Sequence, residues 1–242
     1  MKPAVVKAAR STPKLRADAL VPVHWEARAA SRVLETGRDQ ILERSRKIVD
    51  AAYELLEEQG LEGLTIRAVL NKTGLSRRAF YERFEGKDDL VLAVFENTII
   101  RAANHIGELV QATSDSLERL RIIVTSIVLG NISLAAPDGA QSNRRSAALS
   151  REHLRLAESR PADLQNALSP LLALLAKQLA DGMKAGSVRT DDPHRMATLV
   201  YNLVSTTVHT ELLAHERAKP DPEARTRLAA DIWEFCRRAI AA

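Results

Sequence analysis

The sequence predicts an all-α fold, and three features indicate it. Alternating runs of β-branched residues, which would mark strands, do not occur, whereas long stretches rich in Ala, Leu, Arg and Glu do. The ten glycines and nine prolines cluster between these stretches, where helices would end. With 242 residues, 45% of them apolar and 27% charged, the chain can bury a sizeable core as a soluble globular protein.

Residues 1–38 are expected to form a basic, mostly disordered extension. Three prolines interrupt residues 1–24, which hold few large apolar side chains, and residues 25–37 allow one short helix. Residues 1–47 hold 11 Lys or Arg and five Asp or Glu, a local charge of +6 in a chain whose total is +4. Such a segment favours an anionic partner, nucleic acid or a membrane surface, or else is a solvated tail.

Residues 39–86 predict three helices. The first, 39–60, places apolar side chains on one face and ends at Gly60, a residue suited to a left-handed C-cap. The second covers residues 65–74 and the third residues 76–84. Each begins at a Thr or Ser, which are good N-caps.

Residues 87–242 predict a helical body. A long helix starts near Lys87, and a loop with Pro-Asp-Gly turn residues lies at 136–142. Pro170 predicts a kink or a fresh helix start. The further helices are expected at residues 115–135, 144–159, 161–185, 193–218 and 223–241.

A helix-turn-helix pattern spans residues 65–84. Gly74 supplies the permissive backbone of a tight turn, and Ser76 caps the helix that follows. In that helix Phe80 and Phe84 lie four residues apart and face the core. Two short helices about a glycine turn are typical of this motif.

Arg77 and Arg78 lie at the start of the helix after the turn, where they can enter a major groove. An arginine there can pair with both major-groove acceptors of a guanine. The alternative interpretation is an ordinary surface helix whose arginines are only solvated. Thr65, Tyr81 and Lys87 are candidates for phosphate contacts. The residues expected to contact DNA are Thr65, Arg67, Ser76, Arg77, Arg78, Tyr81, Arg83 and Lys87.

Seven residues of this stretch occupy the places and spacings of a known consensus. They are Thr65, Gly74, Ser76, Tyr81, Phe84, Lys87 and Leu90. On these residues, positions 41–95 resemble the TetR (tetracycline-repressor-like) family, and the resemblance beyond them is architectural only. One departure is Arg83, since the family often has an aromatic residue or His before the Phe.

The resemblance implies a helix-turn-helix DNA-binding domain (39–86) joined to an effector-binding and dimerisation body (87–242). It implies a transcriptional regulator, a repressor that a small-molecule effector releases from a palindromic operator in double-stranded DNA. Residues 2–16 would then be a candidate arm toward that DNA.

The resemblance also implies a homodimer in which the last two helices pair with those of a second subunit. Alternatively, the apolar side chains of these two helices pack only within the monomer and not against a second subunit. These side chains are Leu199, Leu203, Val204, Val208, Leu212, Ile232, Trp233 and Ile240.

An effector pocket is expected among the middle helices, between the helix near Lys87 and the penultimate one. The low aromatic content of 4% indicates an aliphatic lining and an apolar effector. Each polar candidate can instead be an ordinary hydrogen-bonded group of the core or of an interface, with no contact to an effector. The candidates are Asn104, His105, Thr125, Asn131, Tyr201, Asn202 and His209.

Other functional classes have little support in the sequence. Neither a zinc-ligand motif nor a nucleophile elbow, P-loop or dinucleotide fingerprint occurs, so we expect no metal, no cofactor and no enzyme activity. The single cysteine, Cys236, and the lack of a membrane-spanning apolar run favour the cytoplasm. The alternatives are a helix-turn-helix regulator that is constitutive or controlled by a protein partner, and an all-α enzyme or binding bundle.

Overall fold

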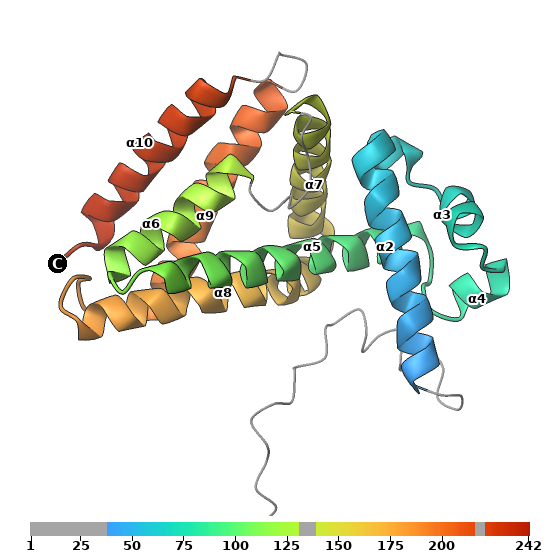
Figure 1. The fold of residues 1–242 in the computed structure, drawn as a ribbon, viewed down its shortest axis with the longest axis horizontal. Helices are drawn as coiled ribbons and strands as arrows, with labels where there is room; N and C mark the ends of the chain where they lie inside the picture. Colours follow the sequence, from blue (N-terminus) through green and yellow to red (C-terminus); the bar gives the residue numbers. More distant parts are fainter. Residues whose placement is uncertain (1–37, 131–138, 216–220) are drawn as a thin grey trace, which may run out of the picture.

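The computed structural model describes residues 38–130, 139–215 and 221–242 (Figure 1). In this part of the chain the structure is helical, with one isolated β-bridge between Val188 and Ala241, so the all-α prediction is confirmed. The expected basic extension lies, except for residue 38, outside the described residues, as do residues 136–138 of the expected loop and the candidate Asn131. The prediction of a loop is wrong for residues 139–142, because helix α7 already begins at Gly139.

The N-terminal helices are α2 (Arg38–Gly63), α3 (Ile66–Thr73) and α4 (Arg77–Tyr81). Gly60 has a φ of 70° inside the assigned span of α2, so the regular helix is interrupted where the sequence predicted its end. Helix α4 is shorter than expected, because the chain leaves the helix after Tyr81 and turns toward α5.

In the described part of the chain the body begins with a long helix and continues with five more. They are α5 (Lys87–Leu109) with the short 3-10 turn η1 (Val110–Ala112), α6 (Ser116–Leu129), α7 (Gly139–Ser159), α8 (Pro161–Lys184), α9 (Pro193–Ala214) and α10 (Pro222–Ile240). Helix α8 continues through Pro170, so no fresh start occurs there. Leu168 and Leu171, on either side of the proline, are buried in the core and hold both halves in one helix.

Buried side chains form two hydrophobic clusters. The N-terminal cluster joins α2, α3 and α4 to the first two turns of α5, and Phe80, Phe84 and Leu90 are at its centre. The body cluster joins the rest of α5 to α6, α7, α8, α9 and α10. In the body α8 lies along α5, while α10 packs mainly on α6.

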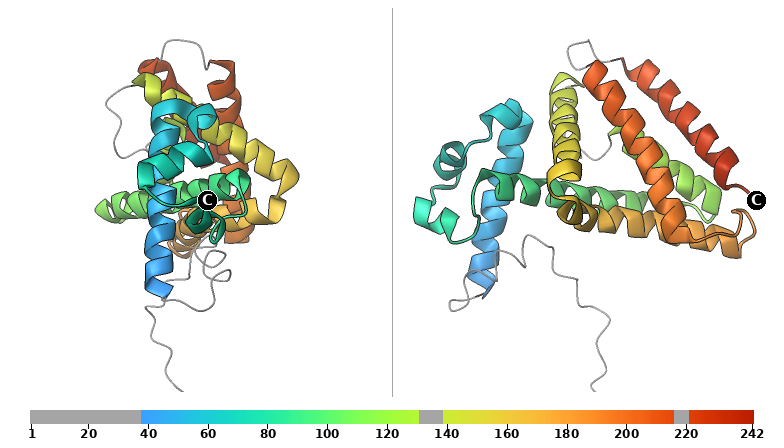
Figure 2. Two further views of the ribbon diagram at one scale, coloured as in Figure 1. Left: turned by 90° about the vertical axis from the view of Figure 1, so that its right-hand side faces the viewer. Right: turned by 180° about the vertical axis from the view of Figure 1, so that it is seen from behind.

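Helix α5 belongs to both clusters, and Figures 1 and 2 show it running from the N-terminal helices deep into the body. Helix α7 also packs on α2, and its Leu149 contacts both clusters. Arg101 of α5 donates to Asp50 of α2 at 2.6 Å and lies over the Tyr53 ring. The N-terminal helices are therefore fixed to the body through α5 and α7.

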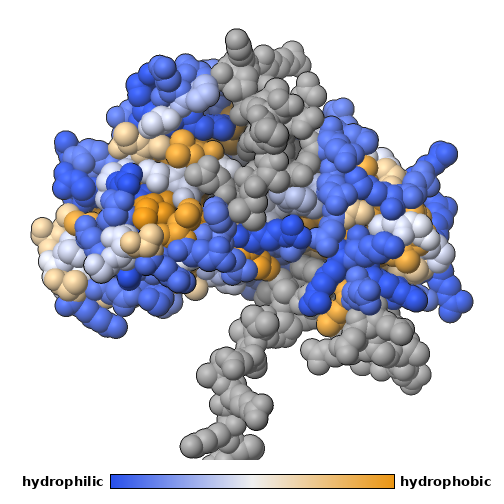
Figure 3. Space-filling view, viewed as in Figure 1, coloured by the Kyte–Doolittle hydropathy of each residue, from blue (hydrophilic) through white to orange (hydrophobic). Residues whose placement is uncertain are grey.

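Hydrophilic residues cover most of the face drawn in Figure 3, and apolar residues reach this surface mainly over the body. Among the described helices, none combines the length and the apolar character that crossing a bilayer would require.

Gly74 in the turn should be sensitive to substitution. Its φ is 69°, a conformation that costs a residue with a Cβ about 1–2 kcal/mol. A Cβ at Gly74 would meet no atom within 4 Å, so Gly74→Ala tests backbone strain alone. We expect a loss of about 1 kcal/mol in the free energy of unfolding, measured by urea denaturation.

Gly86→Ala is the matched control. Gly86 has a φ of 173°, an extended backbone open to any residue, and a Cβ there also meets nothing within 4 Å. Equal losses in the two variants would contradict the assignment of strain to Gly74.

Candidate nucleic-acid interface and effector pocket

The turn between α3 and α4 is held by two capping hydroxyls. Thr65 Oγ1 accepts from the Ala68 amide at 3.1 Å, and Ser76 Oγ accepts from the Ala79 amide at 3.1 Å. Because each hydroxyl accepts at the helix end, its own O–H stays available to donate outward. Both residues are exposed, as a phosphate contact requires.

Helix α4 presents its arginines to solvent and buries its aromatic ring. Arg77 and Arg78 are exposed, and Tyr81 is half exposed with its ring edge-to-face against buried Phe80. Arg78 Nε donates to Glu82 at 2.9 Å, and this contact lowers the pKa of the Glu82 carboxyl. An exposed pair of this kind is weak, so Arg78 can exchange Glu82 for a DNA acceptor.

Two further candidates, Arg67 and Lys87, are exposed near the arginines of α4 in the sequence. Arg67 is exposed on the first turn of α3. Lys87 is exposed at the start of α5, and its Nζ donates to the Leu61 carbonyl at 3.2 Å. The structure thus places seven of the eight predicted DNA contacts on the surface formed by α3, α4 and the first turn of α5.

Arg83 is the exception, and the prediction for it is wrong. Its side chain is only 3% exposed, Nη1 donates to the Ala79 carbonyl, and the guanidinium pairs with Glu82. A guanidinium held inside the fold cannot reach a phosphate. The sequence held a signal of this, because an aromatic residue or His at the same place in the family indicates an inward-facing position.

A pocket opens in the body between α5 and α9, where the sequence predicted one. Side chains from α5, α6, α7, α8, α9 and α10 line it, and its cavity volume is about 90 Å³. Most of the lining is apolar, with Phe95, Ile99, Val128 and Leu171 among its walls. An apolar cleft with a few polar groups is the usual form of a small-molecule site.

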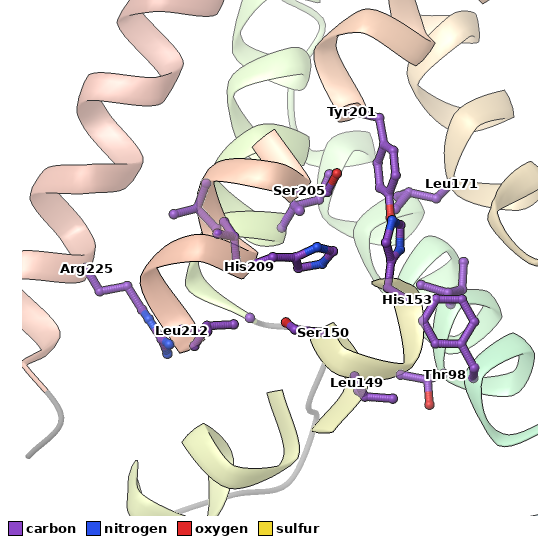
Figure 4. A pocket seen from close by; sticks show the side chains of 16 residues that line it. Thr98, Leu149, Ser150, His153, Leu171, Tyr201, Ser205, His209, Leu212 and Arg225 are labelled. Atoms are coloured by element: carbon purple, nitrogen blue, oxygen red, sulfur yellow. The ribbon is translucent and has the colours of Figure 1, made fainter. Parts of the chain in front are cut away.

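Two histidines face each other in this pocket (Figure 4). The ring of His153 from α7 and that of His209 from α9 have centroids 4.5 Å apart and meet edge-to-face. His153 also lies 6.1 Å from the Phe95 ring and 6.1 Å from the Tyr201 ring. The described residues contain no group of three or more His, Cys, Asp or Glu side chains placed to hold a metal. Each neutral imidazole of the pair can donate one hydrogen bond and accept another.

Burial sets the charge of this pair. Desolvation, together with the neighbouring His153, lowers the pKa of His209 to about 4, and burial also lowers the pKa of His153. Burial raises the pKa of the Tyr201 hydroxyl. All three groups are therefore neutral near pH 7.

Of the six predicted effector contacts that the structure describes, two line the pocket, Tyr201 and His209. Asn104 and Asn202 are exposed, His105 is half-buried away from the lining, and Thr125 bonds back to carbonyls of its own helix. These four lie elsewhere because each falls on the wrong face of its helix.

Sequence reasoning missed His153 and Arg225. His153 shares a helical face with Leu149 and Leu156, a spacing that could have indicated its inward position. Arg225 has charged neighbours in sequence, and only the packing of α10 brings it to the pocket.

The last two helices leave apolar side chains uncovered. Leu199 and Leu203 on α9 and Phe235 on α10 are 62%, 38% and 63% exposed. Of the other side chains expected to pair with a second subunit, Val204, Ile232 and Ile240 are buried, Val208 and Leu212 line the pocket, and Trp233 packs on the body cluster.

Two sequence profiles match the chain. The profile described as "Bacterial regulatory proteins, tetR family" matches residues 48–94, and that described as "AefR-like transcriptional repressor, C-terminal domain" matches residues 140–239. The chain belongs to the TetR family. The predicted DNA-binding transcriptional regulator is thereby confirmed, and the first match spans the whole helix-turn-helix.

Similar proteins agree with membership of the TetR family. A fatty acid metabolism regulator protein of Bacillus subtilis is 20% identical over 172 residues, 71% of this chain and 84% of that protein. A TetR-family regulator from Pectobacterium atrosepticum has a TM-score of 0.66 at 17% identity, with 86% of this chain and 98% of that chain covered. FadR from Bacillus subtilis in complex with stearoyl-CoA has a TM-score of 0.58 at 19% identity, covering 79% and 96%. At these identities the structures show the fold alone.

The histidine pair predicts a loss of stability in mild acid. The pKa of His209 is lower in the folded protein than the ordinary value near 6.5, so the unfolded chain binds the proton first. The contribution is present above about pH 6.5 and is lost as the pH falls toward about 4. At pH 5 the loss attributable to His209 is about 2 kcal/mol relative to pH 7.

We expect His209→Phe to reduce the drop in melting temperature between pH 7 and pH 5, measured by calorimetry. His153, Tyr201 and Arg225 face the same cavity and remain in the variant, so only the difference between the two pH values is compared. An equal drop in both proteins would show that His209 is not the group that titrates.

Proposed function

We propose that this regulator represses transcription from a palindromic operator and is released from it by a small apolar effector that binds the pocket. One observation carries the proposal: α5 is part of both sites. Its Phe95, Thr98 and Ile99 line the pocket, while Leu90 and Val94 pack in the cluster that supports α4. An effector that displaces α5 therefore displaces the DNA-binding surface.

The DNA-binding surface that we propose omits Arg83. Arg77 and Arg78 enter the major groove and contact bases, and the others position the domain on phosphates. The proposed contacts are Thr65, Arg67, Ser76, Arg77, Arg78, Tyr81 and Lys87. We place the boundary between this domain and the effector-binding body at residues 86 and 87, where α5 begins.

Helix α7 gives the effector a second route to the N-terminal helices. Leu149 lines the pocket and also packs against the N-terminal cluster, and α7 packs on α2. Arg155 of α7 lies 3.7 Å from Asp88 in the first turn of α5. A ligand that pushes α7 away from α5 would rotate the pair of N-terminal helices, and only a difference in its affinity for the two states drives the change.

The comparisons support a ligand-controlled repressor. The profile over residues 140–239 is described as that of a repressor, and FadR, similar in fold, was solved with stearoyl-CoA. All the named relatives are transcriptional regulators, so an enzyme finds no support among them. The single cysteine, Cys236, is a buried free thiol, and we propose a reducing cytoplasm as the location.

We propose further that the regulator is a homodimer through α9 and α10. Leu199, Leu203 and Phe235 supply the uncovered apolar surface that a second copy would bury. Dimerisation sets the distance between the two α4 helices, which must match half-sites about 34–36 Å apart.

The arginines of α4 can be tested by selecting bound fragments from random duplex DNA. Arg77→Ala and Arg78→Ala should each relax the preference at particular base pairs by about tenfold or more, because a bidentate pair to guanine is lost. Lys87→Ala should weaken all sequences about equally. Fluorescence anisotropy on the selected fragment measures both effects.

Arg121→Ala is the control for charge. Arg121 is an exposed helical arginine paired with Glu118 on α6, remote from α4. Binding that falls as much in Arg121→Ala as in Arg77→Ala would argue for general electrostatics, and against base recognition by α4.

The dimer surface can be tested by placing charge on it. Leu199→Glu and Phe235→Glu should shift the protein to a monomer in light scattering after gel filtration and abolish operator binding, because a buried carboxylate would lack a partner. Leu154→Glu is the control, since Leu154 is 47% exposed on α7 and outside the proposed surface. A dimer that survives both charged variants would exclude this interface.

A further inference from the structure

The polar groups of the pocket fall into two sets. Thr98 donates its hydroxyl to a carbonyl of its own helix at 2.8 Å, and Ser205 does the same at 3.4 Å. His153, His209 and the hydroxyls of Tyr201 and Ser150 have no hydrogen-bond partner in the described part of the chain. These four groups line the pocket, so they are open to a hydrogen bond from a ligand or from water.

Arg225 is the one formal charge on the described lining of the pocket, and no carboxylate accompanies it there. It is half-buried, and burial lowers the pKa of its guanidinium. Arg227, two residues further along, is exposed and pairs with Glu223 at 3.6 Å. A half-buried guanidinium without an acid complements an anion.

The two polar features occupy different parts of the pocket (Figure 4). Arg225 reaches in from α10 beside Leu212, and the His153 ring lies beyond His209, toward Tyr201. Apolar side chains form the rest of the pocket lining. A ligand that meets both features must therefore be elongated, with a charge at one end and a neutral polar group further along.

We propose that the effector is an apolar monocarboxylate with an uncharged oxygen, a hydroxyl or carbonyl, along its chain. Its carboxylate pairs with Arg225, and its second oxygen bonds to the neutral imidazoles of His153 and His209. This rests on the proposed function, because it names the ligand that would work through α5 and α7.

The charge count favours the free acid over a coenzyme A thioester. One guanidinium on an otherwise uncharged lining balances one negative charge, and the histidines are neutral near pH 7. A thioester lacks the carboxylate and carries several phosphate charges instead. The free acid and the thioester are therefore separate arms of the test.

The test uses calorimetric titration of the full-length protein without DNA. The probes are straight-chain acids of eight to sixteen carbons, their hydroxylated forms, their methyl esters and their coenzyme A thioesters. The native protein should bind the best acid about tenfold or more tighter than its ester or thioester. Arg225→Gln should lose that preference, and Arg227→Gln, the matched control, should keep it.

The hydroxyl is tested in the same titration. The best hydroxylated acid should bind more tightly than the unsubstituted acid of equal length, and His209→Phe should remove this advantage while keeping the preference for acid over ester. Melting temperature and operator binding without ligand confirm that each variant is folded.

Several outcomes would overturn the inference: no acid binds, acid and ester bind equally to native protein, or Arg225→Gln still prefers the acid. The proposed function fails separately. It fails if the protein binds no selected DNA fragment, or if a ligand bound through Arg225 leaves the complex with that fragment intact.

Discussion

One helix buried in two cores is the constraint on which the rest of the structure depends. The first turns of α5 complete the cluster beneath α4, and its later turns form a wall of the pocket. Cores pack at high density, so a buried helix cannot shift at one end and stay fixed at the other. Packing therefore gives the proposed coupling between the two sites a physical path, and Leu149 of α7 adds a second path by touching both clusters.

The pocket differs from the surrounding core in what it leaves unsatisfied. The body cluster is built from aliphatic side chains whose burial stabilises the fold. Beside it the pocket holds two neutral imidazoles, a phenol, a serine hydroxyl and a guanidinium, all without partners in the described residues. Such groups can bond to a ligand, and a difference in the affinity of that ligand for two states of the protein would shift the equilibrium between them.

The DNA-binding surface relies on short elements that are strongly fixed. Helix α4 has five residues, too few to be stable alone, and depends on its Ser76 cap and on buried Phe80. Lys72 ties α3 to α2 through Glu54 and Glu58, at 3.0 and 2.9 Å. These contacts fix the position of α3 and α4 and do not involve the exposed arginines Arg77 and Arg78.

The sequence by itself determined the helical class, the caps at Thr65 and Ser76, the turn at Gly74 and the outward face of α4, because these depend on residues within a few positions of one another. It also located the pocket between α5 and α9. Only the tertiary structure decided which polar side chains face that pocket. Segments distant in the sequence pack on each helix, and their positions determine which of its faces is buried. It thus replaced Asn104 and Asn202 with His153 and Arg225, and turned Arg83 inward.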